Sequence, residues 1–154
     1  MISLKWSLER IELLIDVLDE LFREWRDGAC IVVEGRRDRE ALEALGLKTG
    51  VVAFKTLNCC MSDAIERLCY SDRVVILTDF DHEGEELASR ISEVLTKRGV
   101  EVNLEVRRKL SHILRGEVKG FEDLGPLLDR LSVRFKIPLT PFAVGCARRL
   151  GENP

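Results

Sequence analysis

The sequence predicts an α/β fold, with a mostly parallel central sheet of about four strands flanked by helices. Short apolar, β-branched runs alternate along the chain with longer stretches whose apolar residues recur at helical spacing. The runs are apolar at every position, which is typical of strands covered on both faces, and helices between such strands imply right-handed crossovers. With 154 residues, 45% of them hydrophobic, the chain can bury one sizeable core.

The first element is an amphipathic helix. Between residues 7 and 26 the apolar side chains recur on one helical face. Ser7 has the side chain of an N-terminal cap, and Gly28 can end the helix. We expect this helix to pack on the sheet.

Three strand-to-helix steps follow. Each pairs a short apolar run with an amphipathic stretch, as in a repeated β-α unit. The predicted strands are Ala29–Val33, Val51–Phe54 and Val74–Leu77. The helix after the first strand would turn Ala41, Leu42 and Leu45 inward, and the helices after the second and third strands would span Met61–Cys69 and Glu83–Lys97.

The last predicted strand differs from the others. From Val100 to Val106 apolar and polar residues alternate strictly, which indicates an edge strand with one face in water. The leucines at 124, 127, 128 and 131 then form one more helical face. After them Pro138 and Pro141 break regularity, and the tail is not assigned.

These elements suggest three segments: an N-terminal amphipathic helix over 1–28, a central domain over 29–131 and a C-terminal extension over 132–154. No apolar run reaches the roughly 20 residues that a membrane helix requires. The N-terminus also lacks the pattern of a signal peptide. We therefore expect a soluble, cytoplasmic protein with no membrane partner.

Composition narrows the function classes further. The five cysteines form no CxxC pair, which argues against structural zinc and favours free thiols. The net charge of −3 is not that of a typical nucleic-acid binder, yet basic residues gather from Arg107 to Lys119 while carboxylates gather from Asp79 to Glu86. The absence of glutamine, with only three asparagines, favours a thermophilic source.

Two predicted strands end in carboxylates. Glu34 and Gly35 follow the first strand, and Asp79 and Asp81 follow the third. Functional groups gather at the carboxyl ends of parallel strands, and converging carboxylates repel one another unless a cation neutralises them. Mg²⁺ suits such a site because it takes hard oxygen ligands, often one or two carboxylates together with water and phosphate. Mn²⁺ can substitute for it.

These residues resemble the signatures of the toprim domain, which is shared by type IA and type II topoisomerases, bacterial primases, certain nucleases and small ribosomal-RNA maturases. The first signature is Glu34-Gly35 followed by Asp38, and the second is the string from Asp79 to Glu85, DFDHEGE. The second is especially similar to the type IA topoisomerase version. The resemblance covers roughly 29–131 and implies a toprim, Rossmann-like fold.

The resemblance also implies roles for individual residues. Glu34 would act as general acid or base, Asp79 and Asp81 would hold Mg²⁺, and Glu83 would be an auxiliary ligand. Asp38 is expected to be structural, as a first-turn helix acid or a partner of a neighbouring arginine. Further candidates for phosphate or nucleic-acid binding are Gly35, Lys55, Asn58, His82, Arg107, Arg108 and Lys109.

Several functions remain open within this resemblance. The only tyrosine, Tyr70, precedes the third strand, so a topoisomerase is disfavoured. A replicative primase would need a larger polymerising platform. We expect a metal-dependent endonuclease on structured RNA, with RNA favoured over DNA. The alternative is a non-catalytic nucleic-acid or nucleotide-binding module within a replication, repair or RNA-processing complex, and a third is a structural protein without metal. A protein partner and the oligomeric state are left open.

Overall fold

The computed structural model describes residues 6–57, 59–68 and 70–139, and its centre is a four-stranded parallel sheet. The strand order is β2-β1-β3-β4, and every neighbouring pair is parallel. The predicted fold class is therefore confirmed. The strands are β1 (Cys30–Val33), β2 (Val51–Ala53), β3 (Arg73–Leu77) and β4 (Glu101–Asn103).

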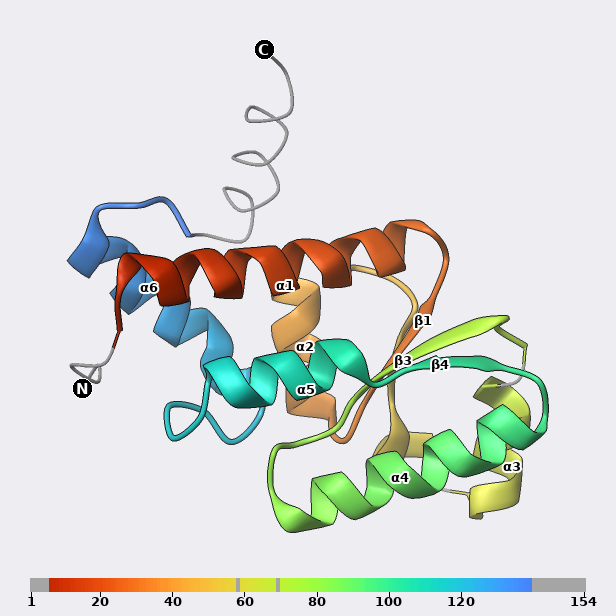
Figure 1. The fold of residues 1–154 in the computed structure, drawn as a ribbon. Coiled ribbons are helices and arrows are strands. Elements are labelled where there is room, and N and C mark those ends of the chain that lie inside the picture. Colours follow the sequence, from red (N-terminus) through yellow and green to blue (C-terminus); the bar gives the residue numbers. More distant parts are fainter. Residues whose placement is uncertain (1–5, 58, 69, 140–154) are drawn as a thin grey trace.

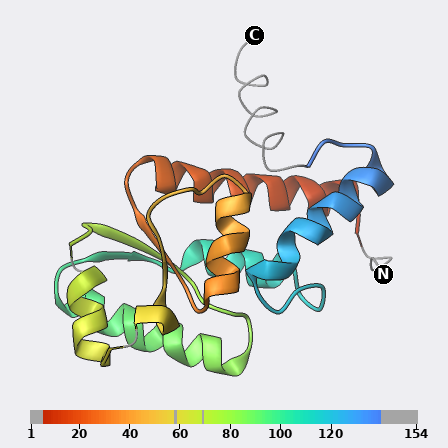
Figure 2. The same cartoon turned by 180° about the vertical axis from the view of Figure 1, so that it is seen from behind.

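Helices cover both faces of this sheet (Figures 1 and 2). One face carries α1, α2, α5 and α6, and the other carries α3 and α4. The helices are α1 (Leu8–Arg26), α2 (Arg36–Ala44), α3 (Met61–Leu68), α4 (His82–Lys97), α5 (Glu105–Ile113) and α6 (Leu124–Phe135), with short 3₁₀ turns η1 (Phe54–Leu57) and η2 (Phe121–Asp123).

The apolar strands divide their side chains between two cores. In β1, Ile31 and Val33 pack with the helices on one face, while Cys30 and Val32 pack with those on the other. Successive strand residues point to opposite sides, so a strand buried on both faces must be apolar throughout. The continuous apolar runs in the sequence have this cause.

The N-terminal helix forms where the sequence predicts it. The Ser7 side-chain oxygen accepts a hydrogen bond from the Arg10 backbone N–H at 3.2 Å, which caps the start of α1. Gly28, just after the helix, has a φ of +94°, a backbone conformation that residues other than glycine rarely adopt. The helix packs against α5 and closes one side of the core, as expected.

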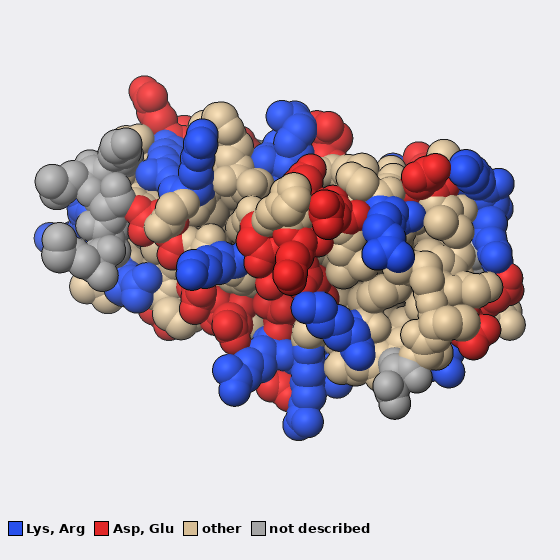
Figure 3. All heavy atoms as spheres, turned by 90° about the horizontal axis from the view of Figure 1, so that it is seen from below, with Lys and Arg blue, Asp and Glu red and all other residues tan. Residues whose placement is uncertain are grey.

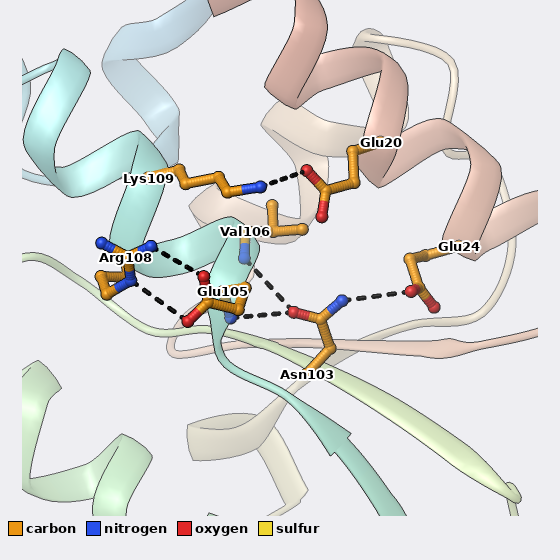
Figure 4. Close-up of polar contacts among 7 residues, drawn as sticks. All are labelled: Glu20, Glu24, Asn103, Glu105, Val106, Arg108 and Lys109. Atoms are coloured by element: carbon orange, nitrogen blue, oxygen red, sulfur yellow. Dashed lines mark hydrogen bonds and ion pairs between the residues drawn. The ribbon is translucent and has the colours of Figure 1, made fainter.

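The predicted edge strand is wrong in its second half. The edge position is correct, but β4 ends at Asn103 and helix α5 begins at Glu105. The Asn103 side-chain oxygen accepts hydrogen bonds from the backbone N–H groups of Glu105 and Val106, at 2.9 and 3.3 Å (Figure 4). This side chain satisfies N–H groups that a new helix leaves unpaired, so it overrides the alternating pattern.

The described part of the C-terminal region is helical. Helix α6 extends to Phe135, four residues past the expected segment boundary at 131. It ends at Lys136, whose φ of 55° is left-handed, ahead of Pro138. Pro141 and the rest of the tail, residues 140–154, lie outside the described residues. Among the residues that are described, no helix has both the length and the apolar character to cross a bilayer.

Candidate functional site

The carboxyl ends of β1 and β3 place Glu34 beside Asp79. The two strands are neighbours, paired from Cys30 with Val74 to Val33 with Leu77. Their next residues therefore leave the sheet at the same edge, where Glu34 Oε1 accepts a hydrogen bond from the Asp79 backbone N–H at 3.1 Å. Two residues that are 45 positions apart in the chain thus meet by direct contact.

The start of α4 lies directly on this strand end. Gly84 is buried in the first turn of α4, and a Cβ atom there would stand 1.9 Å from the Asp79 carbonyl oxygen and 2.8 Å from Glu34 Oε1. The Thr78 hydroxyl donates a hydrogen bond to the Gly84 carbonyl at 2.7 Å. Only glycine permits this close approach, which brings the positive end of the α4 dipole to the carboxylates.

Asp81 serves as the N-terminal cap of α4. Its Oδ1 accepts a hydrogen bond from the Gly84 backbone N–H at 2.7 Å. This oxygen is held by the cap, so a cation would compete with the helix for it. Glu83 is exposed in the first turn, and His82 pairs with Glu86 one turn along the exposed surface of the helix, at 3.1 Å.

Asp38 belongs to the same group of carboxylates. It is only 8% exposed, and its two oxygens accept hydrogen bonds from the backbone N–H groups of Gly35 and Phe121, each at 3.2 Å. The first-turn position in α2 is as expected, but no arginine pairs with it among the described residues. Asp38 thus ties the start of α2 to η2, at the rim of the site.

Gly120 packs against the carboxylates of Asp79 and Asp38, and the sequence did not predict this contact. A Cβ atom at Gly120 would stand 2.9 Å from Asp79 Oδ1 and 3.0 Å from Asp38 Oδ1. The residue is more than 80 positions from Asp38, and an isolated glycine outside any motif carries no local signal of such a contact. Only the packing of η2 against α2 shows that this position has no room for a side chain.

The grouping perturbs Asp79 more than its neighbours. Burial and, to a smaller extent, the negative charges of nearby carboxylates together raise the pKa of Asp79 from 3.8 to about 7. Those neighbours are, in order of effect, Asp38, Glu34 and Asp81. Its Oδ1 is buried and has no hydrogen-bond partner in the described chain. A buried acceptor without a partner is costly, so this oxygen is suited to a cation or another donor.

The unpartnered Asp79 Oδ1 and the carboxylates around it fit a magnesium ion. Within the described ranges no three His, Cys, Asp or Glu side chains converge as a ready-made metal site. An ion would therefore rest on one or two carboxylates, with water and a phosphate oxygen as the remaining ligands. That is a usual arrangement for Mg²⁺ in enzymes that act on phosphates.

Lys55 lies at the open side of this site, as the sequence suggested. It follows β2, and its Nζ is 3.1 Å from Glu34 Oε2. The hydrogen bond and charge of Glu34 raise the pKa of Lys55 above its usual value. The lysine side chain is 62% exposed and that of Glu34 only 5%, so the ammonium can also meet a ligand from solvent. Asn58, predicted beside it, lies outside the described residues.

Arg107 supports the site from within the protein. The residue is 5% exposed, and its guanidinium donates to the carbonyl oxygens of Thr78 and Asp79, at 3.1 and 2.6 Å. A third contact pairs it with Glu85 of α4 at 2.6 Å. The sequence suggested a phosphate contact, but these donors are directed to protein acceptors. The arginine therefore fastens the end of β3 to both α4 and α5.

Arg108 and Lys109 are paired with acidic residues outside the carboxylate site. Arg108 pairs with Glu105 on the exposed side of α5, and Lys109 pairs with Glu20 of α1 (Figure 4). The wider face has both signs of charge. Figure 3 shows Asp and Glu side chains gathered near its middle with Lys and Arg around them. Such a field can attract a cation centrally and phosphates at the sides.

Replacing Asp79 by asparagine is expected to stabilise the metal-free protein at pH 8. The pKa of Asp79 is higher in the folded state, so its ionisation opposes folding. The penalty is absent below pH 4, grows as pH rises, and is complete above pH 7. Because Asp79 is partly exposed, we expect a gain of about 1 to 2 kcal/mol at pH 8 and none at pH 4.

Thermal melts in chelator at both pH values would measure this gain, with Asp72→Asn as an exposed control. Added MgCl₂ should raise the melting temperature of the wild type more than that of the variant, because ligand binding stabilises the folded state. A destabilised variant at pH 8 would contradict the electrostatic account.

Comparison with known proteins gives a consistent result for the sequence. The toprim domain family matches residues 28–104. A UPF0292 protein of Pyrococcus horikoshii is 38% identical over 132 residues, which cover 86% of this chain and 94% of that protein. A UPF0292 protein of Methanocaldococcus jannaschii is 35% identical, over 75% of this chain and 90% of its own. The similarity thus extends over nearly the whole length of small relatives.

A solved structure of a protein from Aquifex aeolicus has the same fold. Its TM-score is 0.58 at 24% sequence identity, and the match covers 70% of this chain and 94% of that one. At this level of identity the likeness concerns the fold alone.

Proposed function

Because this chain belongs to the toprim domain family, we propose that it performs magnesium-dependent phosphodiester chemistry on nucleic acid, as an endonuclease that acts on structured RNA. Membership in the family supports the general part of this proposal, namely a metal-binding domain associated with nucleic acid. The cleavage reaction and the preference for RNA over DNA are the proposal. A protein partner that helps to select the substrate is compatible with it.

One observation supports the proposal most directly: the carboxylate that follows β1 contacts the backbone at the end of β3, where a carboxylate oxygen of Asp79 is buried without a partner. Glu34 and Asp79 are in contact at the carboxyl edge of the sheet, and Asp79 Oδ1 has no hydrogen-bond donor in the described chain. A purely structural cluster would satisfy its buried acceptors. The site has the chemistry of a cation-dependent centre.

Asp79 and Asp81 would hold the ion, with Glu83 as an auxiliary ligand, and the ion would be Mg²⁺ with Mn²⁺ as a substitute. When bound, it would offset negative charge on the phosphate. Asp79 offers a buried oxygen and Asp81 lies two residues further, where the strand has turned into its loop. Glu83 is exposed in the first turn of α4 and can turn toward the same side.

Glu34 is suited to proton transfer because it is set apart on β1. The Asp79 N–H holds its Oε1, which leaves Oε2 as the oxygen that gives or takes the proton. That oxygen faces the Lys55 ammonium, which can orient it and contact a phosphate from the exposed side. Proton transfer, at Glu34, is thus separated from cation binding, at Asp79 and Asp81.

The position of Tyr70 disfavours the topoisomerase alternative. Tyr70 is 91% exposed and precedes β3, at the amino end of the strand whose carboxyl end carries Asp79. A five-residue strand spans about 16 Å, so this hydroxyl lies at the opposite edge of the sheet from the carboxylates. A tyrosine nucleophile would have to reach the metal-bound phosphate.

A cleavage panel tests the proposed function. Labelled structured RNAs and DNAs are incubated with Mg²⁺ or Mn²⁺, and wild type is compared with the variant that combines Asp79→Asn and Asp81→Asn. We expect metal-dependent cutting of RNA that falls about 100-fold or more in the variant, because the groups that fix the cation are gone. The charge-matched control combines Asp72→Asn with Asp129→Asn, both exposed and away from the site.

The outcomes separate the function classes. Cutting of DNA in preference to RNA would overturn the substrate assignment while keeping the reaction. Binding of nucleic acid without cutting by any form would favour the non-catalytic module. Equal loss in the site variant and the control would show that net charge, and not the carboxylate site, drives the effect.

A further inference from the structure

A groove lies between α4 and α5, beside the carboxylate site. Its volume is about 1140 Å³, slightly above the roughly 300 to 1,000 Å³ usual for small-molecule pockets. The first turns of α4 form one wall, α5 and the loop after it form the other, and Phe80 and Asp81, between β3 and α4, also line it. Asp81 is close enough to raise the pKa of Asp79, so the groove adjoins the site.

The loop after α5 also reaches the carboxylate site. The Lys119 carbonyl accepts a hydrogen bond from the Phe80 backbone N–H at 3.1 Å. The next residue, Gly120, approaches Asp79 so closely that a Cβ atom would be 2.9 Å from its Oδ1. Lys119 is exposed and lines the groove, so this residue lies where the groove adjoins the carboxylates.

Basic residues follow the α5 wall of the groove. Arg108 and His112 are four residues apart on one face of α5, and Arg115 follows in the turn after the helix. Arg108 already pairs with Glu105, but Arg115 and Lys119 are exposed and pair with no carboxylate in the described chain. These two cations are available to phosphates.

The carboxylates in the groove are partly neutralised. Glu85 pairs with Arg107, and Glu105 pairs with Arg108. Glu117 and Asp123 also line the groove, so its charge is mixed. Binding to a polyanion should therefore be moderate in strength and fall steeply with salt.

Phe80 gives the groove an aromatic surface. Phe80 is partly buried, and its ring packs edge-to-face against Phe121, with ring centroids 5.5 Å apart. A ring held in this way can stack on an unpaired base, and stacking suits single strands because duplex bases are not accessible. The groove thus combines phosphate donors along one wall with a base platform next to the site.

We propose that this groove binds one single-stranded segment of the nucleic-acid substrate, with Arg115 and Lys119 on its phosphates and Phe80 against a base. This inference rests on the proposed function and deepens it. A strand placed there would lead its phosphodiester to Glu34 and Asp79. Structured RNA would then be engaged at a loop, bulge or end rather than along its helical part.

Binding measurements with matched variants test the proposal. The groove variant combines Arg115→Ala with Lys119→Ala, and the control combines Arg26→Ala with Lys48→Ala, exposed residues outside the groove that remove the same charge. Fluorescence anisotropy of a short, labelled single-stranded uridine oligonucleotide is followed in chelator over a range of salt, with the corresponding deoxy oligonucleotide and a hairpin duplex as competitors.

We expect the groove variant to lose about tenfold in affinity, and its salt slope to fall by about 1.4, since each single-strand phosphate contact contributes about 0.7. The control should keep both values. Equal losses in the two variants, no binding by wild type, or a preference for duplex over single strand would overturn the groove assignment.

The same variants distinguish this failure from failure of the proposed function. The expected binding pattern without cleavage by any form would support the groove and remove the endonuclease assignment. Cleavage by wild type with no difference between the two double variants would keep the endonuclease and overturn the groove.

Discussion

Replacing Glu34 by glutamine is expected to lower the rate of metal-dependent cleavage by about 10² to 10⁴, the usual contribution of a general acid or base. Glutamine has nearly the same shape but cannot exchange a proton. The affinities for Mg²⁺ and for nucleic acid should change little, because the carboxylates assigned to the ion and the basic groove stay intact. Single-turnover cleavage at saturating protein would isolate this chemical effect.

The fold should tolerate this change. The amide oxygen of glutamine can still accept the hydrogen bond from the Asp79 N–H, which Glu34 accepts at 3.1 Å. Only the ion pair with Lys55 is lost, and Lys55 is largely exposed, so we expect a cost below about 1 kcal/mol.

Glu86→Gln is the matched control, since Glu86 is exposed and pairs with His82 on the outer side of α4. Its cleavage rate should equal that of wild type. Unchanged cleavage in the Glu34 variant would remove the proton-transfer role and leave Glu34 as a structural acceptor for the end of β3.

Replacing Gly84 by alanine is expected to be the most damaging small substitution for stability. The added methyl group would stand 1.9 Å from the Asp79 carbonyl oxygen and 2.7 Å from its carbon, which are backbone atoms that cannot rotate away. Helix α4 must move off the end of β3. We expect a loss of about 3 kcal/mol, at the upper end for overpacking, and a melting temperature lower by about 6 to 12 °C.

Cleavage should also disappear in this variant. A shift of about 1 Å in the start of α4 moves Asp81 relative to Glu34 and Asp79, and displacements of that size can cost about 100-fold in rate. Urea unfolding and cleavage of the same preparation would show both effects.

Gly125→Ala is the control for the loss at Gly84. Gly125 is also helical, but no atom outside its own helix backbone and its chain neighbours lies within 4 Å of a Cβ built there. Alanine at this position should leave cleavage unchanged and cost much less stability than at Gly84, because only the following Pro126 disfavours a side chain there. A Gly84 variant as stable as this control would contradict the close packing of α4 on β3.

The continuous apolar runs were sufficient to predict the sheet and its carboxyl edge. The order of elements as far as the start of β4, the parallel arrangement and the cap at Ser7 all follow from patterns a few residues long. The meeting of Glu34 with Asp79 also follows, since neighbouring parallel strands end at one edge of the sheet. Glu34 comes directly after the first apolar run, and Asp79 comes two residues after the third.

Other features could not be predicted because they depend on a partner distant in sequence. The strand that was expected to reach Val106 ends at Asn103, where hydrogen bonds to Glu105 and Val106 start α5. Arg107 was predicted as a candidate for phosphate or nucleic-acid binding in a basic stretch. In the fold it is buried, because carbonyl oxygens at the end of β3 and Glu85 of α4 satisfy its donors.

The sequence by itself therefore determined the elements other than α5, and the acidic site, because apolar periodicity and strand-end carboxylates are local properties of the chain. Tertiary structure alone decided how tightly that site is enclosed. Gly120 and Asp38 reach Asp79 from separate segments, and α5 with α4 forms the groove beside it. Burial, pKa and contact distances depend on which segments pack together, and no short stretch of sequence contains that information.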